Sequence, residues 1–460
     1  MSTTSEDRAV ATMRAGATSL PVWPVAAYFG LTPLWWALGL LDMVLMPLAV
    51  AMGALLAARG NVRVPRGFAL WLLFLVWMGC SIVMVDTPNH MVAFLYRAGI
   101  YVGATVLFLY VYNLSGQNVG RRVAGILTIH WLSVVAGGLA GIALLGSVVR
   151  TPTFYVLQAV SPGLVNVDFI NHMVVRRFAQ YNPDSYLGVA GRPSAPFLYA
   201  NNWGNVYSLL LPVVIAYMLT LNRRGERRDR VVFWTLAVTI AISVVPASFT
   251  MNRGMLIGLG LAALYVSVRM AMRGNLLAVV VILGAAAIGG LAFQHLAGDR
   301  LETRLEGSGT ETRGSLYQQS LDAVPESPIF GYGVPIASDN PDAPPVGTQG
   351  QFWMVLVSHG PVAIAAFISF FLLAWFRSRR LWDPVGLVTS TLCLVACVEL
   401  GFYGVVPYGL PIMMTIAALA LRGCTRPAIH RAPEEDPPER FGPAAPALPA
   451  VNGLSSDGAR

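Results

Sequence analysis

The chain has 460 residues, of which 55% are hydrophobic and only 12% are charged, and its mean hydropathy is +0.61. Soluble domains carry roughly twice that share of charge, so this composition excludes a soluble multidomain protein and predicts an all-α, polytopic integral membrane protein. The net charge of +8 comes from arginine alone, since the sequence contains no lysine. Nucleic acid is excluded as a partner, because no soluble basic surface is available to bind it.

Apolar stretches of about 17 to 25 residues, the length that a helix needs to cross a bilayer, recur along the chain. From them we predict about twelve transmembrane helices in a domain over 21–424. A polar segment over 1–20 precedes this domain, and a tail over 425–460, rich in Pro, Ala and charge, is expected to be disordered. The stretches lie at 21–39, 41–58, 67–85, 93–114, 123–147, 203–221, 231–248, 254–271, 275–294, 351–376, 383–402 and 404–421.

Arginine clusters between these stretches indicate the orientation of the protein. They follow the second, fourth, sixth, eighth and tenth stretches, so an alternating arrangement places all of them on one side. Because arginine-rich loops stay in the cytoplasm, both termini are expected to be cytoplasmic. The clusters contain Arg59, Arg63, Arg66, Arg121, Arg122, Arg223, Arg224, Arg227, Arg228, Arg230, Arg273, Arg377, Arg379 and Arg380.

Two long segments then face outward, 148–202 and 295–350, and the second is a large extracytoplasmic loop between the ninth and tenth stretches. In the first segment, the spacing of apolar residues over 162–178 predicts a helix that lies in the outer interface. In the second, Thr310 is expected to cap a helix over about 311–324. The side chains that this helix would bury are Leu316, Leu321 and Val324.

Four arginines break the charge pattern, because Arg97, Arg192, Arg253 and Arg313 all lie on the outer side. A guanidinium at the edge of the hydrocarbon needs an anionic partner, and its planar fork of donors fits phosphate oxygens in pairs. Arg313 also lies in the first turn of the predicted loop helix, where free N–H groups favour phosphate. The alternative is pairing with lipid headgroups or with acids such as Glu399, near the outer end of the eleventh stretch. For Arg192, Arg253 and Arg313 together, we favour a shared anion site.

An isoprenoid pyrophosphate suits such a site, with its chain between the helices and its phosphates on the arginines. If a sugar is attached to the pyrophosphate, stabilising the departing pyrophosphate is the main catalytic need. Arginine can supply that stabilisation, so neither a metal nor a cofactor is predicted. The remaining need is a base that takes the proton of the acceptor hydroxyl.

Three short motifs surround the outer arginines. Arg192–Asn201 reads RPSAPFLYAN, Asn252–Gly254 reads NRG, and Arg313 is followed by PIFGYG at Pro328–Gly333. In this order the motifs resemble those of the O-antigen ligase and polymerase superfamily of bacterial membrane proteins. Two positions depart from the pattern of that family, Ala195 and Ala200.

The resemblance covers about 185 to 405 and implies a multi-pass transferase of the bacterial cell membrane. Such an enzyme moves a glycan from an undecaprenyl-pyrophosphate-type donor to a growing polysaccharide or cell-surface acceptor, without a metal. Its implied partners are the lipid-linked donor, a glycan or lipid acceptor, and membrane lipids. Arg313 is implied as catalytic. The substrate-binding residues that we expect are Arg97, Arg192, Asn201, Arg253 and Glu399.

The base is harder to assign, because the family often has a histidine where this chain has Gln349, and an amide cannot accept a proton near neutral pH. His359 is the base that we expect, although it lies roughly 15 Å farther along the same helix at about 1.5 Å per residue. The alternative is a buried histidine bonded to a backbone carbonyl. Asp184, Asp339 and Asp342 are the other candidates.

Two other functions stay open. A transporter or flippase for lipid-linked oligosaccharide would use the arginines only for binding, and it needs a polar route to the cytoplasm, for which His130 is a lone mid-span candidate. A transferase that uses monophosphate-linked sugars needs an acidic pair in the first outer loop, which offers only Asp42. Cys393 and Cys397 lie one helical turn apart and are interpreted as packing residues rather than as metal ligands.

Overall fold

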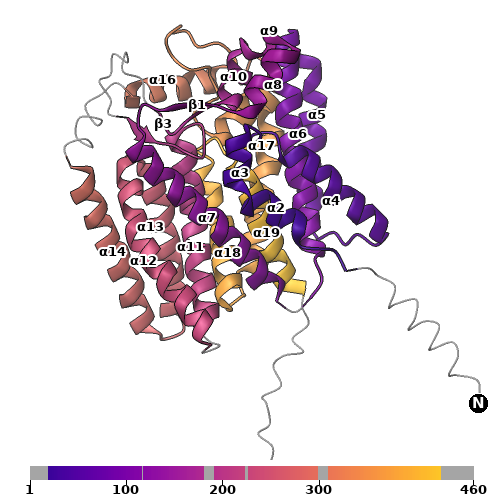
Figure 1. Cartoon of the computed structure of the whole chain (residues 1–460). Helices are drawn as coiled ribbons and strands as arrows, with labels where there is room; N and C mark the ends of the chain where they lie inside the picture. The colour runs from indigo at the N-terminus through magenta and orange to yellow at the C-terminus, as the bar shows by residue number, and fades with distance from the viewer. Residues whose placement is uncertain (1–18, 117, 181–190, 223–225, 299–308, 426–460) are drawn as a thin grey trace, which may run out of the picture. The chain divides into compact units, whose positions relative to one another are not determined.

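The structure of the chain is a computed structural model (Figure 1), and its described elements belong to one compact unit, Met1–Cys424. The predicted terminal segments, 1–20 and 425–460, fall almost wholly outside the described residues, as does Asp184. The described residues are 19–116, 118–180, 191–222, 226–298 and 309–425.

The described chain is mostly helical, as predicted, and helices form over each of the predicted apolar stretches. Seven described helices are long and apolar enough to cross a membrane, namely α6, α7, α11, α12, α13, α14 and α17, and α4, α5, α18 and α19 are shorter apolar helices. The count of twelve crossings therefore stays a prediction. The helices are α4 (Leu45–Arg59), α5 (Phe68–Cys80), α6 (Pro88–Asn113), α7 (Val119–Ala143), α11 (Ala200–Asn222), α12 (Arg227–Phe249), α13 (Arg253–Ala271), α14 (Leu276–Ala297), α17 (Gln351–Ser378), α18 (Pro384–Glu399) and α19 (Gly409–Thr425).

The first predicted stretch forms two short helices, α2 (Trp23–Gly30) and α3 (Thr32–Leu38). Pro33 lies in the first turn of α3, where its ring fits, but it could not continue α2 as an interior residue.

The buried share of each helix distinguishes the central helices from the peripheral ones. In α11 and α17, 67% of the most apolar window is buried, against 6% in α14, which lies at the edge of the bundle (Figure 1).

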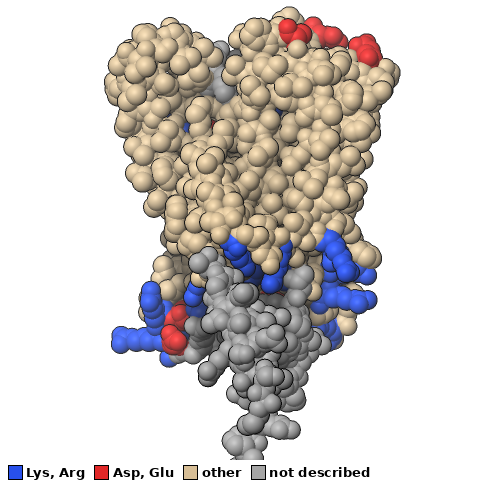
Figure 2. Space-filling model, turned by 90° about the vertical axis from the view of Figure 1, so that its right-hand side faces the viewer, with Lys and Arg blue, Asp and Glu red and all other residues tan. Residues whose placement is uncertain are grey.

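The described arginines of these clusters lie together at one end of the helices, which we call the arginine-rich end (Figure 2). Arg59 at the end of α4 donates from Nη1 to the carbonyl oxygen of Asn113 at the end of α6 (2.6 Å). Arg121 of α7 forms an ion pair of 3.1 Å with Asp229 of α12. These contacts join loops that are far apart in the sequence, as the alternating arrangement requires.

The opposite end, which we call the loop end, carries the first long segment as short helices and strands (Figure 1). They are α8 (Pro152–Val160), α9 (Pro162–Val165), α10 (Asp168–Val174), β1 (Val148–Arg150), β2 (Val175–Arg177), β3 (Ala179–Gln180) and β4 (Arg192–Pro193). The prediction of one helix over 162–178 was wrong, because α9 and α10 are separate and the chain then pairs as β2 antiparallel to β1. Pairing with a distant strand overrides the helical spacing of the apolar residues.

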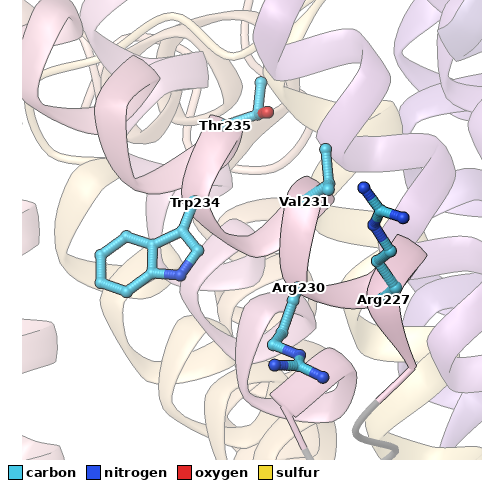
Figure 3. A pocket seen from close by; sticks show the side chains of 5 residues that line it. All are labelled: Arg227, Arg230, Val231, Trp234 and Thr235. Carbon is cyan, nitrogen blue, oxygen red and sulfur yellow. The ribbon is translucent and has the colours of Figure 1, made fainter.

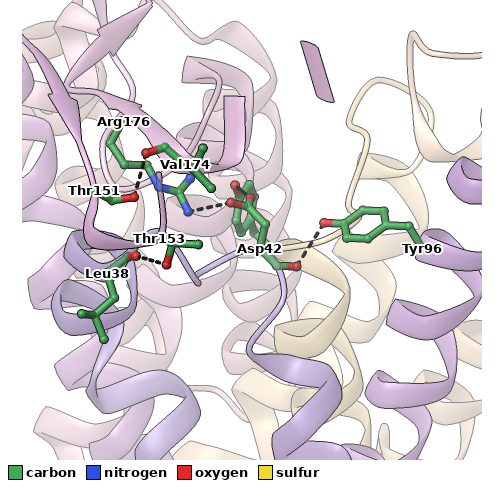
Figure 4. Close-up of polar contacts among 8 residues, drawn as sticks. Leu38, Asp42, Tyr96, Thr151, Thr153, Val174 and Arg176 are labelled. Carbon is green, nitrogen blue, oxygen red and sulfur yellow. Dashed lines mark hydrogen bonds and ion pairs between the residues drawn. The ribbon is translucent and has the colours of Figure 1, made fainter. Parts of the chain in front are cut away.

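A buried ion pair fastens this segment to the bundle (Figure 4). Nη2 of Arg176, in β2, lies 2.7 Å from Oδ2 of Asp42, and the two side chains are 3% and 6% exposed. The hydroxyl of Tyr408 donates to Oδ1 of Asp42, and that of Tyr96 donates to its backbone oxygen (3.0 Å). Breaking a buried pair leaves an uncompensated charge, so Asp42 serves as an anchor between the first helices, α6 and the α18–α19 connection.

The second long segment contains α16 (Gly309–Asp322), which starts before the predicted helix. Thr310 therefore lies inside the helix and is not its cap, contrary to the prediction. Leu316 is buried as predicted, but Leu321 is 50% exposed, so its predicted burial was wrong.

The helix α17 is broken at Gly360, whose φ of 81° lies in the left-handed region. Pro361 follows it and cannot donate a backbone hydrogen bond, so carbonyl groups in the preceding turn lose their helical partners. The backbone N–H groups of Tyr332 and Gly333 donate to the carbonyl oxygens of Val357 (2.9 Å) and Ser358 (2.7 Å). The PIFGYG motif of the second long segment thus packs into the break in α17.

Candidate functional site

Polar residues from several elements converge on Tyr403, in the connection between α18 and α19. Its side chain is buried, and its hydroxyl donates to Oδ1 of Asn252 at 2.5 Å. Asn252 is the residue before α13, and its Nδ2 donates to the carbonyl oxygen of Ala200 at 3.3 Å. One hydroxyl therefore joins the start of α13, the start of α11 and the α18–α19 connection.

Two glycines of α7 allow the strand that carries Arg192 to pack closely against this helix. A Cβ atom on Gly137 would lie 2.4 Å from the carbonyl oxygen of Ala195, and one on Gly141 would lie 2.5 Å from that of Phe178. Real Cβ contacts essentially never come this close. The segment around β4 therefore lies directly on the backbone of α7, which positions Arg192 at the loop end.

Arg192 is 7% exposed and is held by backbone and side-chain acceptors. Its Nε donates to the carbonyl oxygen of Thr250 at 2.6 Å, and its Nη2 donates to Oδ1 of Asn201 at 3.4 Å. The structure thus brings together Arg192 and Asn201, which the sequence predicted as partners in one substrate-binding motif. Thr250, at the end of α12, adds a third element to this contact.

Arg253 and Arg313 have no hydrogen bond or ion pair with any residue that the structure describes. Arg253 is the first residue of α13, directly after Asn252, and its side chain is exposed, whereas Arg313 is half-buried on α16. Burial, and to a smaller degree Glu399, raises the pKa of the Tyr403 hydroxyl well above 10, while Arg192 and Arg313 lower it. Arg192 and Arg313 therefore act on one hydroxyl. We call Tyr403, Asn252, Asn201 and the three arginines the Tyr403 cluster.

Glu399 lies behind this cluster and does not pair with an arginine among the described residues. It is fully buried at the end of α18, and its Oε2 accepts from Nδ2 of Asn205 at 2.7 Å. A Cβ atom on Gly258 would lie 2.0 Å from its Oε1, which accepts no hydrogen bond within the described part of the chain. Glu399 thus pairs with Asn205 and not with an arginine of the described chain, and its expected role as a substrate-binding residue stays a prediction. It packs α11, α13 and α18 together.

A second polar group surrounds His359, at the break in α17. Its Nδ1 lies 2.7 Å from Oγ of Ser81, the residue that follows α5 at the loop end. Residues 351–359 precede the break at Gly360, so the expected separation of roughly 15 Å between Gln349 and His359 along the helix stays a prediction. Arg97 of α6 is close enough to interact electrostatically with His359. Nη1 of Arg97 is enclosed and has no hydrogen-bond partner among the described residues.

Gln351 joins the two groups. Its backbone N–H donates to the carbonyl oxygen of Tyr403 (2.7 Å), its Nε2 donates to the hydroxyl of Tyr101 (2.6 Å), and its Oε1 accepts from the backbone N–H of Val405 (3.2 Å). Tyr101 in turn lies within electrostatic range of Arg97. We call His359, Ser81, Arg97, Tyr101 and Gln351 the His359 cluster.

The other candidate bases lie apart from these contacts. Gln349 is half-buried and donates from Nε2 to Oγ1 of Thr348 at 3.2 Å. Asp339 and Asp342 are exposed loop residues. His359 lies on the same helix as Gln351, whose backbone N–H donates to the carbonyl oxygen of Tyr403, and it is the candidate base that we retain.

Sequence reasoning missed Tyr403, Gln351 and Ser81. Tyr403 lies between the last two predicted apolar stretches, and Gln351 is the first residue of the tenth, which is a weak signal. Nothing in the sequence places Ser81 beside His359, 278 positions away.

Among the residues that the structure describes, no group of three or more His, Cys, Asp or Glu lies close enough to hold a metal ion. Cys393 is buried, and the thiol of Cys397 donates to its carbonyl oxygen at 3.3 Å, so the two side chains pack within the helix. A surface hollow lined by α12 residues lies at the arginine-rich end, away from both clusters (Figure 3). It is lined by Arg227, Arg230, Val231, Trp234 and Thr235.

Comparison with known proteins gives no relative for this chain: no family model, no curated protein and no solved structure matches it. The resemblance of the three motifs to a transferase superfamily therefore stays a prediction. The two polar clusters at the loop end are the basis on which a function can be assigned.

Proposed function

We propose that the chain is a metal-independent membrane glycosyl or oligosaccharyl transferase of the O-antigen or exopolysaccharide ligase or polymerase type. Its donor is a glycan on a polyprenyl pyrophosphate, and its acceptor is a growing polysaccharide or a cell-surface molecule. The loop end faces outward from the bacterial cell membrane. The observation that carries the proposal is the convergence of Arg192, Arg253 and Arg313, from three separate elements, on the surroundings of Tyr403.

The chemistry of these arginines supports a pyrophosphate ligand. Two of the guanidinium groups lack a partner among the described residues, and an unpaired cation at a membrane edge is costly until an anion meets it. Each guanidinium can bind two phosphate oxygens. Arg253 also opens a helix of 19 residues, whose free N–H groups favour the same charge. A pyrophosphate leaving group carries enough charge to engage all three arginines.

Transfer at this site is a substitution at the anomeric carbon. The acceptor hydroxyl forms the new glycosidic bond, the bond from the anomeric carbon to the pyrophosphate oxygen breaks, and the electron pair leaves on the pyrophosphate. Arg313, together with Arg192 and Arg253, stabilises that developing charge. The hydroxyl proton passes to His359, which lies on the same helix as Gln351 and bonds to Ser81.

The flippase alternative finds little support in the described residues. His130, its mid-span candidate, bonds to Oγ1 of Thr32 at 2.7 Å and packs against the rings of Phe29 and Phe197. It is therefore a packed residue rather than part of a polar route.

The experiment that separates these functions uses the purified full-length protein in vesicles, with a polyprenyl-pyrophosphate-linked oligosaccharide labelled on its sugar. We expect the label to appear on a longer or newly attached glycan, with one polyprenyl pyrophosphate released per transfer, and we expect no reaction with the monophosphate-linked sugar. Movement of intact donor between the leaflets, without bond cleavage, would favour the flippase. A donor that neither reacts nor moves would contradict the proposal.

A further inference from the structure

The same hydrogen-bond arrangement occurs at two buried histidines. Oγ of Ser81 lies 2.6 Å from the carbonyl oxygen of Met78 and 2.7 Å from Nδ1 of His359. Oγ1 of Thr32 lies 2.8 Å from the carbonyl oxygen of Phe29 and 2.7 Å from Nδ1 of His130. In both cases a hydroxyl stands between a helix carbonyl and an imidazole.

Counting hydrogens identifies the tautomer of each ring. A hydroxyl has one hydrogen to donate, and a carbonyl oxygen can only accept. At 2.6 Å from the Met78 oxygen, the hydrogen of Ser81 must lie on that contact, since two bare acceptors would repel each other. Ser81 then accepts from His359, so the hydrogen of the neutral ring is on Nδ1 and the lone pair is on Nε2.

The surroundings of the two histidines differ. His130 is enclosed by the rings of Phe29 and Phe197. His359 also meets an aromatic edge, that of Phe94, but in addition it lies within electrostatic range of Arg97, and the residue after it is the break in α17. His359 thus has an ionic neighbour at the loop end, whereas His130 has a purely structural setting.

The turn that carries Ser81 is held in place by the outer loop. Nε1 of Trp77 donates to the carbonyl oxygen of Ile329 at 2.8 Å. A Cβ atom on Gly333 would lie 2.7 Å from the Val85 side chain and 3.2 Å from the carbonyl oxygen of Ser81, so the PIFGYG motif packs directly on this turn. The motif therefore fixes both partners, Ser81 on one side and the α17 break that carries His359 on the other.

We propose that Ser81 is a positioning residue for the transfer reaction, and that it holds His359 in the tautomer whose Nε2 accepts the acceptor proton. The proposal rests on the proposed function, because it assigns the nitrogen that acts in that step. The matching Thr32–His130 pair is a structural contact without a catalytic role. The Thr32–His130 pair therefore serves as an internal control for the Ser81–His359 pair.

The first test reads the tautomer without any substrate. The full-length protein, labelled with ¹⁵N-histidine, is measured by solid-state NMR in lipid bilayers, and the His359 signals are identified by their loss in His359→Gln. We expect a protonated Nδ1 and a bare Nε2 in the wild-type protein, a mixture of tautomers in Ser81→Ala, and the wild-type pattern in Ser81→Thr. A protonated Nε2 in the wild-type protein, or an unchanged pattern in Ser81→Ala, would overturn the proposal.

The second test measures transfer in the vesicle assay. Ser81→Ala should lower kcat by about tenfold or more with little change in KM for the donor, because a misplaced base weakens the chemical step and not donor binding. Thr32→Val should leave kcat unchanged. Equal losses in the two variants would show a structural role only. A wild-type protein with the expected tautomer but without transfer would overturn the proposed function and the role of His359 in it, and would leave the tautomer assignment intact.

Discussion

Replacing Arg192 by alanine should reduce glycan transfer at least about 100-fold, the loss that follows removal of one donor to a developing anion. Arg192 is held by the carbonyl oxygen of Thr250 and by Asn201, so its guanidinium is oriented before any ligand arrives. Without it the leaving pyrophosphate loses one of its three cationic neighbours. The measurement is the initial rate of transfer in vesicles, at matched amounts of membrane-inserted protein.

Arg150→Ala is the matched control for this variant. Arg150 also lies at the loop end, in β1, but it is exposed and its guanidinium stacks over the ring of Phe154 at 5.2 Å, outside the Tyr403 cluster. Its removal should change the rate by less than about twofold. Arg192→Lys should fall between the two, because an ammonium group keeps the charge but not the planar fork. Equal rates in Arg192→Ala and Arg150→Ala would contradict the assignment.

The second large effect is expected in Gly258→Ala, which should lower the stability of the folded protein by about 1–3 kcal/mol or more, as overpacked cores do. The added methyl group would lie 2.0 Å from Oε1 of Glu399. That carboxyl group is fully buried and bonded to Asn205, so it cannot move aside without losing its hydrogen bond. The measurement is the midpoint of thermal unfolding in detergent, followed by size-exclusion chromatography.

Gly260→Ala, two residues along the same helix, separates this clash from the general effect of replacing a glycine. No atom lies within 4 Å of a Cβ atom built on Gly260. Alanine favours the helix there by roughly 0.5–1 kcal/mol, so this variant should unfold at the same or a higher temperature. If both variants unfold at the wild-type temperature, Glu399 does not pack against α13 as described.

The helices could be predicted from the sequence because a long apolar stretch carries its own signal. The 26 residues of α6 and the 25 of α7 have mean hydropathies of 1.7 and 1.8 in their most apolar windows, with no help from the rest of the fold. The loop end could not be predicted in the same way. Its β2 strand forms because β1, whose residues pair with positions 25 to 29 farther along the chain, is there to pair with it.

The site was predicted only in part. An arginine on the wrong side of the charge pattern is visible in the sequence, which is why Arg192 and Arg313 could be proposed from it. Residues whose role depends on a distant hydrogen-bond partner cannot be predicted in this way. Tyr403 bonds to Asn252 across 151 positions, and Gln351 bonds to Tyr101 across 250. The break in α17 is a different case. Gly360 and Pro361 are a readable helix-breaking signal, and they could have predicted where α17 is interrupted.

Binding of a polyprenyl pyrophosphate to the purified protein, compared with binding of the monophosphate of the same lipid, tests the central claim most directly. The quenching of tryptophan fluorescence by titrated lipid can give both affinities. The account predicts that the wild-type protein prefers the pyrophosphate, and that the triple variant Arg192→Ala, Arg253→Ala and Arg313→Ala binds the two lipids equally. The same preference in the triple variant and in the wild-type protein would contradict the claim that these arginines hold the diphosphate.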